Sequence, residues 1–146
     1  MASRADIIKE IQVVMPLTKR LIHTRMQESL KEHGLTHGEL EFLFALREPA
    51  SNTAAHIAKK LHMTAGAVSQ LVDSQVRLGF VTRRLDPNDR WVCNLALSPA
   101  GRTVVESMIA SRQAMMAAAM DDLTTQELEL LLSVQQKLVN ALQKGK

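Results

Sequence analysis

The sequence has few features of a disulfide-bonded, membrane-spanning or secreted protein. Its single cysteine, Cys93, has no second cysteine with which to form an internal disulfide, which fits a reducing compartment. Stretches without charge, such as residues 113–120, are far shorter than the roughly 20 residues that a membrane-spanning helix needs. The first residues, MASRAD, lack the apolar core of a signal peptide. We therefore expect a soluble, cytoplasmic protein with no membrane partner.

Motifs that carry enzyme chemistry are also missing. The sequence has no phosphate-binding glycine loop, no serine, histidine and aspartate pattern with a nucleophile elbow, and no paired carboxylates in an evident cleft. It has no internal repeat and no low-complexity tract. We expect a protein that is not an enzyme, with no catalytic residues, no cofactor and no metal site.

The chain has 146 residues, of which 46% are hydrophobic, which is enough for one core and calls for no second independent domain. The net charge of +3 is small but unevenly placed. Residues 51–102 carry seven Lys and Arg against three Asp and Glu, whereas the charges of residues 1–50 and 103–146 nearly balance. A positive excess confined to one segment favours contact between that segment and phosphate groups.

Residues 3–33 have the periodicity of a long amphipathic helix. Apolar residues recur there at intervals of three or four: Ile7, Ile8, Ile11, Val14, Met15, Leu21, Ile22, Met26 and Leu30. Because proline removes a backbone hydrogen bond and collides with the preceding turn, we expect Pro16 to bend or divide this helix near Met15. His33 and Gly34 then supply a stop signal.

Two short helices follow, each opened by a threonine cap. Thr36 and Glu39 form a capping box that opens a helix to about Arg47, which residues 49–52 end. Thr53 caps the next short helix.

Thr64 caps a further helix that runs to Leu78, with Gly79 in the C-terminal capping position. At about 100° per residue, one side of this helix is mainly apolar and carries Val68, Leu71, Val72, Gln75 and Val76. The opposite side carries Gly66, Gln70, Asp73, Ser74 and Arg77. We expect the first side to pack in the core and the second to face DNA.

Residues 80–85 and 91–97 are rich in β-forming residues and are separated by the turn-forming cluster DPNDR, so they predict a hairpin with Arg90 at its tip. Trp91 is expected to pack on a half-buried face of this hairpin. A helix-turn-helix followed by such a hairpin is a winged helix-turn-helix. The second helix of that shape fits the DNA major groove, and the wing reaches the backbone or minor groove.

The C-terminal part predicts two more helices. Ser98 is an N-cap followed by proline at the first helical position, and it opens a helix to about Met120. Thr124 and Glu127 form a capping signal for a last helix with a row of leucines.

The motifs of the central segment resemble those of the MarR family, the multiple-antibiotic-resistance regulators of bacteria and archaea. The resemblance covers nearly the whole chain and rests on LHMTAGAVSQLVD at residues 61–73, GFVTR at 79–83, DPNDRW at 86–91 and LSPAG at 97–101. It implies a fold that is mainly α with a small β-hairpin wing (α+β).

The resemblance also implies an organisation and a function. A single MarR-type domain, 1–146, would comprise dimerisation helices at 1–33 and 103–146 and a winged helix-turn-helix at 36–101. The homodimer would bind a palindromic operator in double-stranded DNA, act as a repressor, and be released by a small-molecule effector.

This chain departs from the family pattern at two places. Trp91 replaces the second arginine that follows Asp89 and Arg90, and Gly66, Ala67 and Gln70 stand where hydroxyls and an arginine are common. Contacts of alanines with thymine methyl groups, of Gln70 with adenine, and of Arg90 with a narrow minor groove favour an A/T-rich site. The predicted DNA-binding residues are Thr64, Ala65, Gly66, Ala67, Ser69, Gln70, Arg77, Arg83, Arg84, Asp89 and Arg90, with Asp89 orienting the wing.

Two alternatives remain open at this point. One is a metal- or redox-responsive sensor of the same fold that uses His33 and His37, with Glu39 and Glu41 nearby, or Cys93. The other is a winged-helix module that binds protein instead of DNA. The metal content of the purified protein tests the first, and salt-dependent DNA affinity tests the second.

Overall fold

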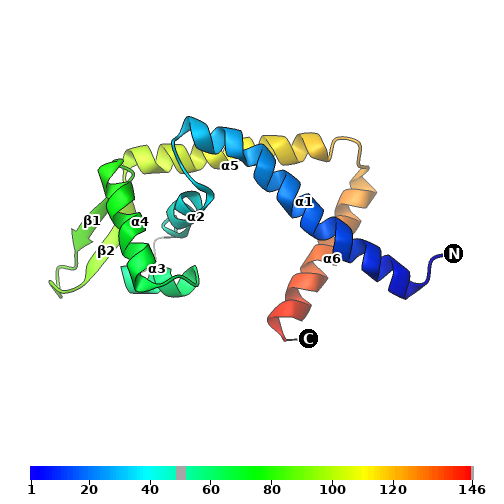
Figure 1. The fold of residues 1–146 in the computed structure, drawn as a ribbon, viewed down its shortest axis with the longest axis horizontal. Coiled ribbons are helices and arrows are strands. Elements are labelled where there is room, and N and C mark those ends of the chain that lie inside the picture. The colour runs from blue at the N-terminus through cyan, green and yellow to red at the C-terminus, as the bar shows by residue number, and fades with distance from the viewer. Residues whose placement is uncertain (49–51, 146) are drawn as a thin grey trace. The chain divides into compact units, whose positions relative to one another are not determined.

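The computed structural model describes residues 1–48 and 52–145. Within this part of the chain the elements follow the order α1 (Arg4–Glu32), α2 (His37–Ala45), α3 (Ala54–Lys60), α4 (Ala65–Arg77), β1 (Val81–Leu85), β2 (Cys93–Leu97), α5 (Pro99–Ala119) and α6 (Thr125–Gln143) (Figure 1). The predicted fold class, mainly α with one small hairpin, is confirmed. No helix in the described residues is both long enough and apolar enough to cross a membrane.

Helix α1 is continuous, so Pro16 does not divide it, and the alternative of a bend near Met15 stays a prediction. The helix begins in a capping box between Ser3 and Asp6 and runs through Pro16 without interruption. The residues around Pro16 are exposed, so water can replace the backbone donor that proline lacks. The predicted stop is confirmed: Gly34 has φ of +66°, and the N–H of Leu35 donates to the carbonyl oxygen of Leu30 at 3.0 Å.

The predicted threonine caps are confirmed. Thr36 and Glu39 form the reciprocal capping box of α2, and Thr53 accepts a hydrogen bond from the N–H of His56 at 3.2 Å. Helix α2 ends at Ala45, slightly earlier than predicted. The stop signal assigned to residues 49–52 lies outside the described residues except for Asn52.

The turn between α3 and α4 has an unusual backbone. His62 has φ of +53°, in the left-handed region that non-glycine residues seldom adopt. The N–H of the next residue, Met63, donates to the carbonyl oxygen of Ala58 at 2.9 Å, so His62 occupies the position where helices usually end on glycine. This turn sets the angle between the two helices of the helix-turn-helix.

The buried core of the helix-turn-helix region combines residues of several elements. The largest fully buried side chains are Phe42, Leu43, Ile57, Met108, Gln75, Val68 and Val105. Gly101 is required for the close approach of α5 to the base of the wing, because a Cβ there would overlap the backbone of Phe80. Ser98 reinforces this junction: its hydroxyl donates to the carbonyl oxygen of Gly79 at 2.5 Å.

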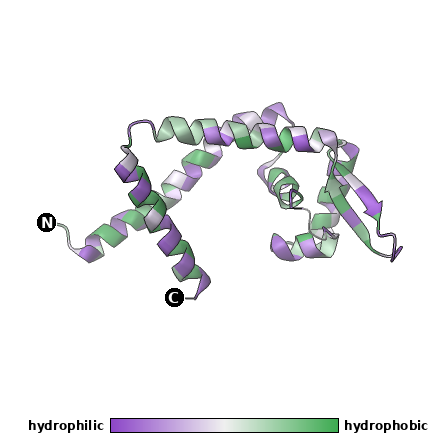
Figure 2. Cartoon of the chain, turned by 180° about the vertical axis from the view of Figure 1, so that it is seen from behind, coloured by the Kyte–Doolittle hydropathy of each residue, from purple (hydrophilic) through white to green (hydrophobic). Residues whose placement is uncertain are grey.

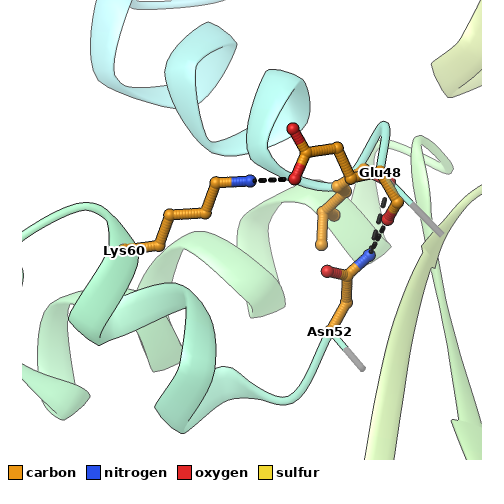
Figure 3. Close-up of polar contacts among 4 residues, drawn as sticks. Glu48, Asn52 and Lys60 are labelled. Atoms are coloured by element: carbon orange, nitrogen blue, oxygen red, sulfur yellow. Dashed lines mark hydrogen bonds and ion pairs between the residues drawn. The ribbon is translucent and has the colours of Figure 1, made fainter. Parts of the chain in front are cut away.

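Asn52 connects the end of α2 to β2. Its side-chain amide donates to the main-chain carbonyl oxygen of Glu48 at 2.9 Å (Figure 3). Its main-chain carbonyl oxygen accepts from the N–H of Leu95 at 2.8 Å. Lys60 contacts the Glu48 carboxylate at 2.9 Å. This hydrogen bond, together with the charge of Lys60, holds the pKa of Glu48 below its ordinary value.

The chain divides into two compact units, residues 1–111 and 112–146. The first contains α1 to α4, the hairpin and most of α5. The second contains the end of α5 and α6, and α6 has no buried residue.

Candidate nucleic-acid interface

Helix α4 has one buried and one exposed side, as its sequence predicts. Val68, Val72 and Gln75 are buried, whereas Gln70 and Arg77 are exposed. Ser74, which was assigned to the exposed side, is half-buried, and its hydroxyl donates to Oε1 of Glu39 at 3.3 Å. The packing of Val68, Val72 and Gln75 in the core therefore decides which side of α4 is exposed. The hydrogen bond from Ser74 to Glu39 helps to hold α4 against α2.

The N-terminal turn of α4 presents small and polar groups. Thr64 caps the helix by accepting a hydrogen bond from the N–H of Ala67 at 3.2 Å, and Ala65, Gly66 and Ser69 are exposed. A Cβ at Gly66 would meet no protein atom within 4 Å. The packing of the fold therefore does not require a glycine there.

The hairpin wing is antiparallel, with Val81 opposite Leu97 and Leu85 opposite Cys93. Two aspartates shape its tip. Asp86 accepts from the N–H groups of Asn88 and Asp89 at 2.7 and 3.2 Å. Together with the hydrogen bond that the Asp89 carboxylate accepts from the backbone N–H of Trp91, these bonds fix the turn between the strands.

Three arginines lie on the wing. Arg83 forms an ion pair with Asp73 of α4, so it connects the wing to that helix. Arg84 and Arg90 are exposed, and within residues 1–48 and 52–145 neither forms an ion pair. The two acidic side chains at the tip accept backbone hydrogen bonds, which leaves the charges of these two arginines available to an outside anion.

Trp91 does not pack on the hairpin as predicted: it is 91% exposed and precedes β2. The backbone N–H of Trp91 donates to Oδ1 of Asp89 at 3.0 Å, and the backbone N–H of Val92 donates to the main-chain carbonyl oxygen of Asp89 at 3.0 Å. These bonds extend the turn through Trp91, so the strand begins at Cys93 and Trp91 lacks a cross-strand neighbour. The β propensity of tryptophan gave no sign of this competition.

The histidines considered for metal sensing lie outside the wing, whereas Cys93, considered for redox sensing, lies on it. His37 contacts Glu41 at 3.3 Å, and the rings of His23 and His37 lie 4.4 Å apart. In the described residues, no group of three or more histidine, cysteine or acidic side chains is placed to hold a metal ion. Cys93 is a partly exposed free thiol on β2.

Known proteins resemble this chain in sequence and in fold. The MarR family pattern matches residues 33–90. The HTH-type transcriptional repressor MdtR of Bacillus subtilis is 27% identical over 141 residues, which cover 97% of this chain and 91% of that protein. A MarR family protein from Bacillus stearothermophilus has a similar fold, with a TM-score of 0.87 at 21% identity over 97% of this chain and 99% of that one. The crystal structure of an S. aureus MepR–DNA complex gives a TM-score of 0.69 at 21% identity over 90% of this chain and 96% of that one.

The family match spans the helix-turn-helix, β1 and the turn up to Arg90, and the likeness to MdtR spans almost the full length of both chains. The chain therefore carries a segment of the MarR family type at residues 33–90 and is similar over nearly its whole length to a transcriptional repressor.

Proposed function

We propose that this chain binds double-stranded DNA as a homodimer and represses transcription. The observation that carries this proposal is the pairing of an exposed α4 surface with a hydrogen-bonded wing whose Arg84 and Arg90 are free of ion pairs among the described residues. A helix in the major groove and a cationic wing on the adjacent backbone or minor groove use both features. The DNA complex of the similarly folded MepR supports this use of the fold.

The eleven predicted DNA-binding residues have different roles in this proposal. Gln70 and the alanines of the first turn face the base edges, where sequence is read. Arg77, Arg84 and Arg90 supply phosphate contacts or enter the minor groove. Arg83 and Asp89 position the wing, since the first pairs with Asp73 and the second holds the turn.

Dimerisation is supported by apolar residues that a single chain leaves exposed. On α1 these include Ile7, Ile11 and Val14, at 48%, 47% and 56% exposure, and on α6 they include Leu132 and Val139, at 59% and 51%. Figure 2 shows hydrophobic bands recurring along both helices. Apolar rows of this extent mark an interface, and a second copy is the partner that a palindromic operator requires.

The repressor role and release by a small molecule are proposed from the likeness to the repressor MdtR and from the resemblance to the family. Release requires an effector that binds the DNA-free arrangement more tightly than the DNA-bound one. A regulator of chromosomal DNA acts in the cytoplasm of a bacterial or archaeal cell, and we place this protein there.

Selection of bound fragments from genomic DNA, followed by footprinting, tests the proposal. We expect two protected half-sites related by a two-fold axis and about one helical turn apart. Protection of a single half-site would contradict the dimer, and recovery of no enriched fragment would contradict sequence-specific binding. Screening compounds for release of the recovered fragment then tests the effector.

Substitutions on α6 test the dimer separately. Leu132→Glu and Val139→Glu introduce charge into the exposed apolar row and should produce a monomer by light scattering. Gln126→Glu adds the same charge at an exposed polar position and should leave the dimer intact. If Leu132→Glu and Val139→Glu both remain dimers, the dimer interface lies elsewhere.

A further inference from the structure

Trp91 is the most exposed large hydrophobic side chain of the wing. Its exposed fraction is 91%, and the chain contains no other tryptophan and no tyrosine. An indole is normally buried against other groups, because its large apolar surface is unfavourable in water. The position therefore needs an explanation outside the fold of the single chain.

The backbone around Trp91 is held in place. The backbone N–H of Trp91 donates to the Asp89 carboxylate, and the backbone N–H of the following residue, Val92, donates to the main-chain carbonyl oxygen of Asp89. Asp86 fixes the other half of the turn through two further hydrogen bonds. A fixed backbone means that the indole can be placed against a partner at a smaller entropic cost than a side chain on a flexible loop.

The neighbours of Trp91 indicate the chemistry of its partner. Arg90 precedes it directly and Arg84 lies on the same hairpin, and both are exposed and free of ion pairs among the described residues. An exposed aromatic ring beside exposed guanidinium groups that form no ion pair among the described residues matches a polyanion that also offers apolar sugar and base surfaces. Duplex DNA has this combination, and the wing already belongs to the candidate interface.

We infer that Trp91 is a DNA-contacting residue, whose indole packs against deoxyribose and base edges of the minor groove beside Arg90. This inference rests on the proposed DNA-binding function. In this proposal, the indole of Trp91 makes an apolar contact where the second arginine of the family pattern would make a charged one. Counterion release makes arginine contacts weaken steeply with salt, whereas packing of an indole releases no counterions. Trp91 should thus contribute affinity that hardly changes with ionic strength.

The tryptophan itself reports on this contact. As the only strong fluorophore of the chain, Trp91 can be followed by acrylamide quenching, with a fluorescently labelled duplex used in parallel to measure binding by anisotropy. The probes are the fragment recovered from genomic DNA, poly(dA-dT) and poly(dG-dC). We expect bound DNA to reduce the quenching constant about twofold or more, since stacking and groove packing shield the ring.

Variants separate this contact from charge. Trp91→Ala should weaken binding about fivefold or more, the low end of what aromatic stacking contributes, with an unchanged salt slope. Trp91→Phe should recover part of the loss, and Trp91→Arg should steepen the salt slope. An equal melting temperature for all variants controls for folding, which is expected because the side chain is exposed.

The outcomes distinguish a failure of the Trp91 contact from a failure of the proposed DNA binding. Anisotropy that shows binding while quenching and the affinity of Trp91→Ala stay unchanged would overturn the role of Trp91 and leave the proposed function standing. No binding of any duplex would overturn both. Quenching that is already low without DNA and rises on dilution would show that a second copy of the chain covers the indole, which also overturns the inference.

Discussion

The guanidinium of Arg83 on β1 and the carboxylate of Asp73 on α4 form an ion pair that joins the wing to α4. The side chains are 49% and 58% exposed, so water screens their attraction. The pair therefore fixes geometry more than it adds stability.

A double-mutant cycle on unfolding with urea tests this ion pair. We expect Arg83→Gln and Asp73→Asn to show a coupling free energy of about 0.2 to 1 kcal/mol, decreasing as salt is added. A coupling of several kcal/mol would contradict the view that the pair is a solvent-screened connection.

Gly66 is predicted to serve DNA approach at the expense of helix stability. Gly66→Ala should raise the free energy of unfolding by about 0.5 to 1 kcal/mol, because alanine favours the helix and a Cβ there meets no protein atom. The same change should weaken DNA binding. Urea unfolding and anisotropy titration measure the two effects.

Gly38 offers a matched control for Gly66. It occupies the same second position in α2, and a Cβ there also meets nothing within 4 Å. Gly38→Ala should stabilise the protein similarly and leave DNA affinity unchanged. Equal loss of affinity in both variants would mean that Gly66 has no special place at the DNA surface.

Gln75 is fully buried, and neither polar atom of its side chain has a hydrogen-bond partner among the described residues. Gln75→Met keeps the length of the side chain and removes the two polar atoms. We expect the free energy of unfolding to rise by about 1 to 3 kcal/mol, the usual penalty for a buried polar group without a partner. Destabilisation in thermal and urea unfolding would show that this amide is satisfied in solution.

Gly101 controls the junction of α5 with the wing. Because a Cβ there would overlap the Phe80 backbone, Gly101→Ala should force α5 away from the turn and destabilise the protein by about 1 to 3 kcal/mol or more. The melting temperature measures this change. A variant as stable as the wild type would mean that α5 moves freely relative to Phe80.

Local signals in the sequence predicted most element boundaries. A helix start depends on one side chain near its own backbone, so the caps at Thr36, Thr53, Thr64 and Thr124 could be identified without the structure. The exposed side of α4 also followed from its periodicity, except at Ser74, which is half-buried against α2.

Features that depend on competition between interactions could not be predicted. The β propensity of Trp91 competes with the turn hydrogen bonds of Asp89, and the position of the carboxylate decides the outcome. The free-energy cost of Pro16 in α1 depends on how exposed the surrounding residues are, and the periodicity of the sequence does not give that exposure. The burial of Gln75 was predicted, but whether an amide finds a partner depends on atoms from distant elements.

The salt dependence of DNA binding by wild type and Arg90→Ala tests the proposed interface most directly. Titrating the recovered fragment at several salt concentrations should give about tenfold weaker binding for the variant and a salt slope lower by about one to two units, since each subunit loses one cationic contact. Arg112→Ala, an exposed arginine on α5 outside the interface, should match the wild type. Unchanged affinity and slope for Arg90→Ala would show that the wing does not touch DNA.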